Sequence, residues 1–279
     1  MTHAASQTLT TFRAGSRSPV MTRTLGLALA AIAFAGAAHA ADDNGDGDGG
    51  PPITPYRPSV SSPAQLPAPG QLELELGGLR KTDSQSSRNS APYLLKLAFN
   101  KEWGVLVGGE AYVSQHGDIG PSQGVGDTTL TLKRAWIVDE ATAFGMEFGV
   151  KLPTANDVIG SGRSDYTINT IFSRDLGPVH MDANFNATQL GQADPGSSHM
   201  LLGASASFST PLSGPWGVTG EVSGTHRNGA DNSVQLLAAL TFSPTRRLTF
   251  DVGVARGFRP RPMATSLFTG VVLPLARLW

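Results

Sequence analysis

Charged and amide side chains recur at every second residue between Gly124 and Gly191, and these are the residues of the sequence that could do chemistry. Glu147 and Lys151, for example, alternate with apolar residues such as Phe148. A period of two is typical of a β-strand that has one polar face and one apolar face. Several such strands side by side would offer ion pairs, hydrogen bonds and a path for polar solutes.

His180 is the residue that best fits a general base, because Asp182 follows it on the same face of a strand. A base and its orienting acid also need a nucleophile, and no sequence pattern identifies a serine for that role. A lipid-cleaving barrel would in addition need this histidine on its apolar face, whereas His180 has the parity of the polar residues. We therefore predict a hydrogen-bonded histidine, no catalytic residues and no enzyme.

Metal and cofactor sites are not indicated either. The chain has no cysteine, which excludes thiol catalysis, disulfides and cysteine-ligated metals. His116, His199 and His226 lack metal-ligand spacing. The acidic run from Asp42 matches the first half of a calcium loop, but Ile53 stands where its last ligand should be. A net charge of −1 does not favour a nucleic-acid partner. We expect no metal, no cofactor and no nucleic acid.

The N-terminal region has the pattern of an export signal. Residues 21–40 combine a short basic start, an apolar core and a small-residue ending, which predicts a signal peptide cleaved after Ala40. Residues 1–20 would be an N-terminal extension, or Met21 is the true start. A membrane anchor is the alternative, but the apolar stretch is short for a span. Residues 41–70, rich in Pro, Gly and Asp, predict a periplasmic linker. From Pro51 this linker could extend as polyproline II or tuck into a barrel mouth.

Residues 71–279 contain twelve segments with alternating apolar and polar residues, joined by connections that are short and long in turn. Outer-membrane barrels have this arrangement, with tight periplasmic turns and longer outside loops. Backbone amides in hydrocarbon all need partners, so the strands must close into a ring. We predict an all-β fold, a transmembrane antiparallel up-and-down β-barrel of about twelve strands with both termini periplasmic. A soluble β-sandwich is the alternative fold.

Aromatic residues favour the barrel, because all four tryptophans fall at the short-turn ends of their segments. Amphipathic rings suit a membrane–water interface, and a sandwich has no reason to gather them at one end. Arg134, Arg174 and Arg277 have membrane-facing parity but lie near these ends, where long side chains can snorkel. The predicted interface anchors are Trp103, Trp136, Trp216 and Trp279 at the short turns, with Tyr93 and Tyr166 at the opposite end.

The last segment alternates apolar residues and ends in Trp279, which resembles the assembly signal of outer-membrane proteins. It predicts the outer-membrane assembly machinery as a partner, alongside outer-membrane lipid and lipopolysaccharide. Pro274 has no amide to give to a strand ladder, so we expect a local bulge there on the inward parity.

The polar parity of the segments predicts the lumen of the barrel. Twelve strands enclose a space between the filled eight-stranded barrel and the wet porin, so some of these groups should pair across it. Glu147 with Lys133 or Lys151 is the simplest pair. The row could be a polar plug of structural ion pairs or a constriction that discriminates solutes. The lumen candidates are Glu110, Asp127, Lys133, Glu147, Lys151, Asp165, Asn169, His180, Asp182, Asn184, Asn186, Glu221 and Asp251.

A series of short motifs resembles a known family. In order they are GVGD at residues 124–127, VKLPT at 150–154, GSG at 160–162, Asp165-Tyr166 and DANFN at 182–186. Together they resemble the outer-membrane β-barrel transporter family named for the MetA-pathway of phenol degradation, over residues 71–279. The resemblance implies an outer-membrane transporter with a link to aromatic-compound catabolism, and it brings no catalytic residues.

The predicted function is therefore an outer-membrane channel that passes small solutes, with aromatic or hydrophobic compounds as candidates. One alternative is a closed structural or surface-interaction barrel without transport, although loops of this length are short for adhesion. A lipid-modifying barrel enzyme is the other alternative, and the position of His180 argues against it.

Overall fold

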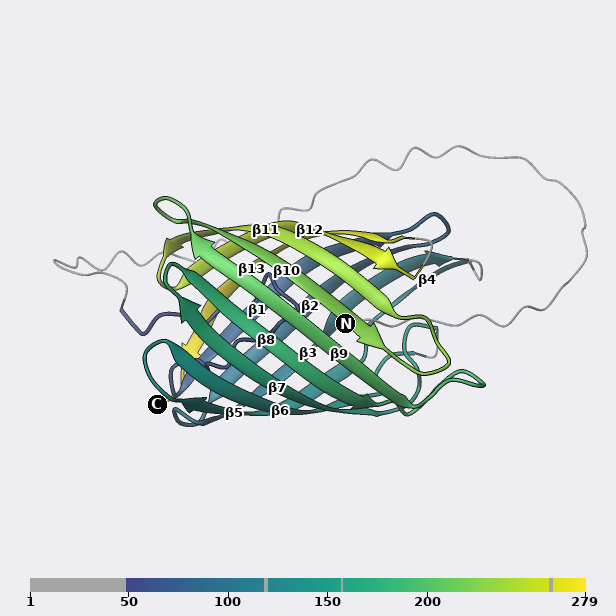
Figure 1. Cartoon of the computed structure of the whole chain (residues 1–279), viewed down its shortest axis with the longest axis horizontal. Helices are drawn as coiled ribbons and strands as arrows, with labels where there is room; N and C mark the ends of the chain where they lie inside the picture. The colour runs from purple at the N-terminus through teal and green to yellow at the C-terminus, as the bar shows by residue number, and fades with distance from the viewer. Residues whose placement is uncertain (1–48, 118–119, 157, 261–262) are drawn as a thin grey trace, which may run out of the picture. The chain divides into compact units, whose positions relative to one another are not determined.

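The computed structural model describes residues 49–117, 120–156, 158–260 and 263–279, which form one closed antiparallel β-barrel (Figure 1). Thirteen strands are formed, of which β4 pairs only with β3, so the ring itself has twelve. The predicted all-β barrel of about twelve strands is confirmed. The strands are β1 (Gln71–Thr82), β2 (Ser87–Ala98), β3 (Trp103–Gly117), β4 (Gly120–Gly124), β5 (Thr128–Ile137), β6 (Thr142–Leu152), β7 (Asp165–Leu176), β8 (Val179–Gln189), β9 (Met200–Pro211), β10 (Trp216–His226), β11 (Ser233–Thr245), β12 (Leu248–Arg259) and β13 (Thr265–Arg277).

The wall has two chemically different faces because neighbouring residues of a strand point to opposite sides. In β6, Phe144 and Phe148 are 46% and 44% exposed on the outside, whereas Ala143 and Glu147 are buried. Phe148 pairs in register with Leu132 of β5 and with Ile168 of β7, so apolar residues meet in rows around the exterior. No helix long and apolar enough to cross a membrane occurs in the part of the chain that the structure describes.

The connections differ from the predicted lengths at two places. Two of the connections expected to be long, residues 80–91 and 114–123, consist mostly of strand, so their expected length was wrong. β1 continues to Thr82 and β2 starts at Ser87, while β3 continues to Gly117 before turning back as β4. The hydrogen-bonded ladder runs on through polar residues, where the apolar alternation that marks a strand in the sequence has already ended.

Pro274 lies at an irregularity, as predicted. The β1–β13 register shifts between Leu72, which pairs with Ala276, and Glu73, which pairs with Pro274. Leu275 is therefore an extra residue on β13, which is a bulge beside the proline.

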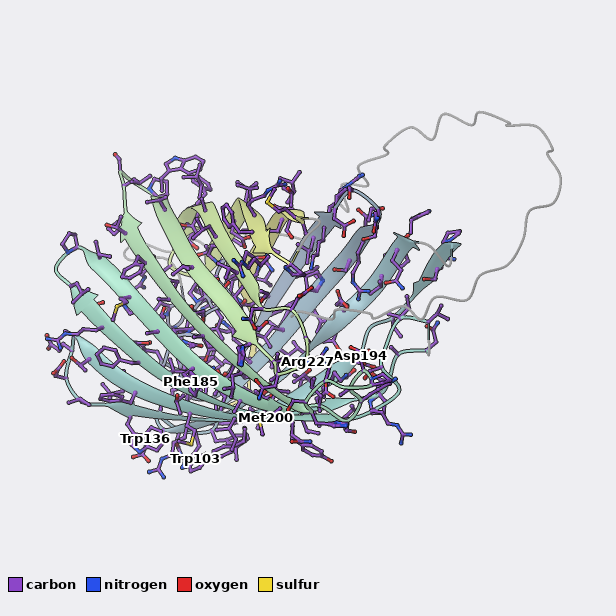
Figure 2. The ribbon with its side chains drawn as sticks, turned by 45° about the vertical axis from the view of Figure 1, so that its right-hand side comes forward. Trp103, Trp136, Phe185, Asp194, Met200 and Arg227 are labelled. Atoms are coloured by element: carbon purple, nitrogen blue, oxygen red, sulfur yellow. The ribbon has the colours of Figure 1, made fainter. Side chains whose placement is uncertain are left out.

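The tryptophans lie at the short-turn ends of their strands. Trp103 opens β3 and Trp136 lies near the end of β5, and the two rings are close together (Figure 2). The Arg134 guanidinium is 5.0 Å from the Trp103 ring centre and 4.8 Å from that of Trp136, which stabilises a cation at this level. Tyr93, expected at the opposite rim, lies in the middle of β2, because that strand extends beyond its apolar part.

Residues 53–66 run inside the barrel, and we call them the lumen segment. The segment starts at the β11–β12 turn, where the Ile53 amide donates to the Arg246 carbonyl at 3.0 Å. It leaves beside β2, where Pro69 forms a β-bridge with Ala98, and continues into β1. Of the two conformations considered for this part of the chain, the structure therefore has the tucked one. The expected signal peptide, residues 1–40, lies outside the described residues.

Candidate functional site

Two acidic residues of β1 and one lysine of β2 hold the start of the lumen segment. The backbone amide of Tyr56 donates to Glu75 Oε1 at 2.7 Å, and that of Thr54 donates to the Glu73 carboxylate at 3.2 Å. Lys96 Nζ lies 3.0 Å from Glu73 and 2.6 Å from Glu75, and it also donates to the Thr54 carbonyl. The side chains of Lys96 and Glu73 are 0% exposed, so this cluster is fully removed from solvent.

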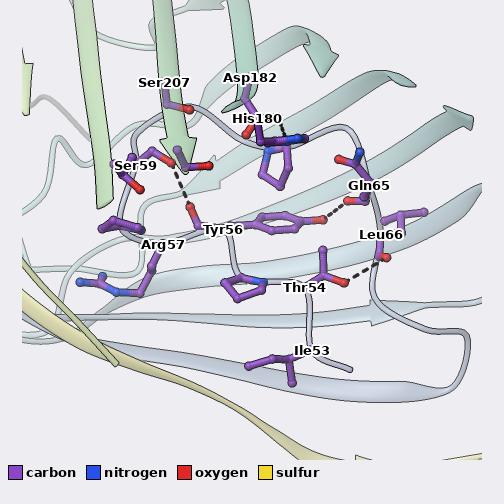
Figure 3. Close-up of a pocket in the computed structure, with 15 residues that line it drawn as sticks. Ile53, Thr54, Tyr56, Arg57, Ser59, Gln65, Leu66, His180, Asp182 and Ser207 are labelled. Atoms are coloured by element: carbon purple, nitrogen blue, oxygen red, sulfur yellow. Dashed lines mark hydrogen bonds and ion pairs between the residues drawn. The ribbon is translucent and has the colours of Figure 1, made fainter. Parts of the chain in front are cut away.

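Two lysines lie over the Tyr56 ring. Lys96 Nζ is 4.4 Å and Lys133 Nζ 4.1 Å from the ring centre, within the range of cation–π attraction. Lys133 also pairs with Glu147 at 3.0 Å. Burial, together with the nearby carboxylates of Glu147 and Glu75, raises the pKa of the Tyr56 hydroxyl well above its ordinary value. The hydroxyl therefore stays protonated, and it donates to the Gln65 carbonyl at 2.8 Å (Figure 3). We call Tyr56, Glu73, Glu75, Lys96, Lys133 and Glu147 the inner cluster.

The middle of the lumen segment is bound to β12 and β10, on the far side of β13 from β1. Arg57 makes a two-point contact with Asp251 of β12, at 2.9 and 3.0 Å. The space for this side chain exists because Gly270 of β13 has none, since a β-carbon there would lie 2.2 Å from Arg57 Nε. The backbone amides of Val60 and Ser61 donate to Glu221 Oε2 of β10 at 2.8 and 2.9 Å. Both wall carboxylates thus accept amide or guanidinium donors from the lumen segment.

The last part of the segment completes the circuit of the lumen. Ser62 and Asn184 of β8 exchange two hydrogen bonds of 2.9 Å, and the Ala64 amide donates to Ser173 Oγ of β7 at 2.7 Å. Lys133 of β5 donates to the Pro63 carbonyl at 2.5 Å. The segment thus contacts strands on every side of the barrel, and it occupies the lumen at the end where the short turns lie.

A second group of charges lies toward the long loops. Lys151 Nζ is 2.8 Å from Asp165 and 3.4 Å from Asp127, and it donates to Ser161 Oγ at 2.6 Å. The Ala155 amide donates to Asp127 at 3.0 Å. We call Asp127, Lys151 and Asp165 the outer cluster. It holds the long loop between β6 and β7, whose residues 153–156 and 158–164 are described, against the inner face of the wall.

The remaining lumen candidates also have defined places. Glu110 pairs with Arg88 at 2.5 Å, and Asn169 Nδ2 donates to Glu147 at 3.0 Å and to Asn184 at 3.1 Å. Asn186 lies beside Gly203 of β9, where it occupies the space of the missing side chain.

His180 makes hydrogen bonds on both ring nitrogens. Nδ1 lies 2.5 Å from Asp175 and Nε2 lies 3.2 Å from Asp182. Asp182 also accepts a hydrogen bond from Ser173. The histidine is thus part of a polar network at the short-turn end of the lumen.

The sequence prediction did not include several residues of the inner cluster. Glu73 and Glu75 alternate with Leu72, Leu74 and Leu76 just as the polar residues of later strands do, so the same parity would have found them. Tyr56 and Arg57 carry no such signal, because the lumen segment has no periodic structure. Two loops at the opposite end are joined by Arg227 and Asp194 at 3.0 Å (Figure 2), a contact that sequence spacing does not indicate.

No protein-family model matches the chain, and no curated protein sequence matches it. Among solved structures, the COG4313 outer membrane channel from Pseudomonas putida F1 is similar with a TM-score of 0.62 and 14% identity, over 76% of this chain and 98% of that one. The NanC porin is similar with a TM-score of 0.54 and 10% identity, over 72% and 100%. The KdgM porin, in complex with disordered oligogalacturonate, has a TM-score of 0.52 and 8% identity, over 72% and 99%. At these identities the likeness shows a shared fold, which is that of outer-membrane barrels.

Proposed function

We propose that this chain is an outer-membrane channel for small solutes whose short-turn half is closed by the lumen segment. The observation that carries the proposal is that the wall is complete without this segment. All twelve strands of the ring pair with both neighbours through backbone hydrogen bonds. The lumen segment is attached mainly through side chains such as Glu221, Asn184 and Ser173. It can leave the lumen without opening the ring.

A lumen without the segment would be wide and acidic. Its short-turn half would expose more carboxylates than ammonium groups. The ammonium groups are those of Lys96 and Lys133, and the carboxylates are those of Glu73, Glu75, Glu147, Asp182, Glu221 and Asp251. Rings of carboxylates favour cations in a water-filled pore. An open state of this channel would therefore prefer cations and neutral solutes. Aromatic or hydrophobic compounds remain candidate solutes, because the motifs at residues 124–186 resemble those of a transporter family linked to aromatic-compound catabolism.

Single-channel recording in planar bilayers tests the proposal. Two proteins of equal length would be compared, the natural chain and a variant with residues 53–66 replaced by a Gly-Ser sequence. We expect a small or intermittent conductance for the first and a several-fold larger, cation-selective conductance for the second. Absence of conductance in both, with correctly folded protein, would favour a closed structural barrel instead.

Membrane placement has its own test. Phe148 lies near the middle of β6 and pairs with Ile168 of β7, so it is a probe of mid-wall depth. Phe148→Arg should destabilise the inserted barrel by about 2–4 kcal/mol if it lies at the bilayer midplane. Leu278→Arg, beyond the end of β13, is the control and should cost about 0–1 kcal/mol because it lies near an interface. Unfolding of both variants in lipid vesicles gives the comparison, and equal costs would argue against this membrane level.

A further inference from the structure

A cavity of about 430 Å³ lies between the lumen segment and the wall (Figure 3). Ten of its fifteen lining residues belong to the lumen segment. The other five come from three neighbouring strands, namely His180 and Asp182 of β8, Ser207 and Ser209 of β9, and Thr219 of β10. The cavity therefore exists only while the segment is docked, and it has a volume typical of a small-molecule site.

The two sides of this cavity differ chemically. The lumen-segment side is largely apolar, with Pro55, Pro58, Pro63 and the Tyr56 ring. The wall side presents hydroxyl, imidazole and carboxylate groups. Gln65 belongs to the lumen-segment side, and its Oε1 is buried and has no hydrogen-bond partner among the described residues. A buried amide oxygen without a partner is costly, so it indicates a donor that a ligand could supply.

The charge of the wall side limits which ligands fit. His180 is enclosed by Asp175 and Asp182, so even a protonated imidazole leaves this group with an excess negative charge. Arg57 lines the cavity too, but its guanidinium is paired with Asp251. An anionic ligand would thus meet an unfavourable potential, whereas a hydroxyl or an ammonium group would find acceptors.

We infer that this cavity binds a small amphipathic solute, with an apolar ring against the prolines and a hydroxyl or ammonium group toward Gln65, Asp182 and Thr219. The inference rests on the plugged channel proposed above. It adds the class of ligand that binds and the effect of that ligand on docking of the segment. A solute that needs both sides of the cavity binds the plugged state alone. By mass action it shifts the docking equilibrium toward closure, by a factor of about 100 at a concentration 100 times its Kd.

A chain of hydrogen bonds also connects the cavity to Ala64, a residue of the lumen segment that does not line the cavity. The Ala64 amide donates to Ser173, and Ser173 in turn donates to Asp182, which lines the cavity. A ligand that donates to Asp182 therefore acts on the same carboxylate that helps to hold the segment. This gives the channel a solute-dependent closing device at its short-turn end.

Calorimetric titration of the purified full chain in detergent tests the site with three probes of one size, benzylamine, benzyl alcohol and benzoate. We expect the amine and the alcohol to bind and benzoate to bind at least tenfold more weakly. Ser207→Phe fills the cavity and should abolish the heat of binding to the site. The heat that remains in this variant measures partition of the probe into micelles and is subtracted. Thr219→Val removes one hydroxyl with little change of shape and should weaken binding several-fold. Thr131→Val, on β5 and outside the cavity, is the matched control and should bind normally.

Benzoate binding as tight as benzylamine, no binding of any probe, or binding that survives both Ser207→Phe and Thr219→Val would overturn the inference. Heat-modifiable mobility on gels verifies that each variant is folded. In bilayers, saturating benzylamine should lower the open fraction, and a raised open fraction would contradict the closing role. Binding without any conductance would reject the channel alone, while conductance without binding would reject this site alone.

Discussion

The inner and outer clusters hold two different pieces of chain by the same arrangement. In each, one lysine is bound by two carboxylates and by one oxygen of a non-strand segment. Lys96 has Glu73, Glu75 and the Thr54 carbonyl, and Lys151 has Asp165, Asp127 and the Ser161 hydroxyl. One cluster fixes the lumen segment and the other fixes the loop between β6 and β7.

The two clusters differ in their access to water. The Lys96 side chain is 0% exposed, whereas that of Lys151 is 11% exposed. Burying a charge is costly unless an ion-pair partner compensates it. When the partner is removed from a site that water cannot enter, the uncompensated charge destabilises the folded protein. The inner cluster should therefore be the rigid end of the lumen, and the outer cluster the end that rearranges more readily. Three substitutions test this difference.

Lys96→Met should have the largest effect. It leaves Glu73 and Glu75 buried beside each other without a cation, which typically costs about 3–5 kcal/mol. We expect a lower unfolding temperature in detergent and a larger conductance, because the lumen segment loses its tightest attachment. Lys101→Met, on the exposed β2–β3 turn, is the control. A stability of Lys96→Met equal to that of the control would show that the inner cluster is not rigid.

Lys151→Met should have a smaller effect, of about 1–3 kcal/mol, because water can reach the two carboxylates it leaves. The change should be local to the loop between β6 and β7. Trypsin cleavage after Arg163, in that loop, would report it. We expect faster cleavage in Lys151→Met than in Lys96→Met. The reverse order would contradict the assignment of the loop to the outer cluster.

Tyr56→Phe should have the smallest effect at neutral pH, about 0.5–1.5 kcal/mol for the hydrogen bond to Gln65. Its pH dependence is more informative. The raised pKa of Tyr56 means that the docked segment holds the phenolic proton more tightly than the released one does. This contribution is complete below pH ~10 and is lost as the pH rises through the raised pKa.

Alkaline pH should therefore release the segment in the natural chain, and tyrosinate absorbance should rise with the conductance. In Tyr56→Phe this part of the alkaline transition should be missing. If both proteins opened at the same pH with the same slope, Tyr56 would have no part in docking.

The wall could be predicted from the sequence because the period of two is a local property of each strand. The same parity identified Lys133, Glu147 and Asp182 as inward residues. It could not choose between the partners considered for Glu147, because that choice depends on register. In the structure Glu147 lies opposite Lys133, while Lys151 lies opposite Asp165.

The lumen segment could not be predicted in the same way. Its contacts join residues far apart in the chain, such as Arg57 and Asp251, and its backbone follows the wall rather than a repeat of its own. The composition of residues 41–70 indicates only that no packed core forms there. Where such a segment lies is decided by the barrel around it.

The junction at Gly70 has a consequence for assembly. Gly70 has a φ of 77°, and its carbonyl accepts the Leu278 amide at 2.8 Å, so the start of β1 is joined to the residues that follow β13. A β-carbon at Gly70 would lie 2.6 Å from the Trp279 carbonyl oxygen, which requires glycine here. The lumen segment enters β1 through this residue, so its last anchor is formed only when the first and last strands have met. The exit of the lumen segment into β1 is thus fixed only in a barrel whose first and last strands have met.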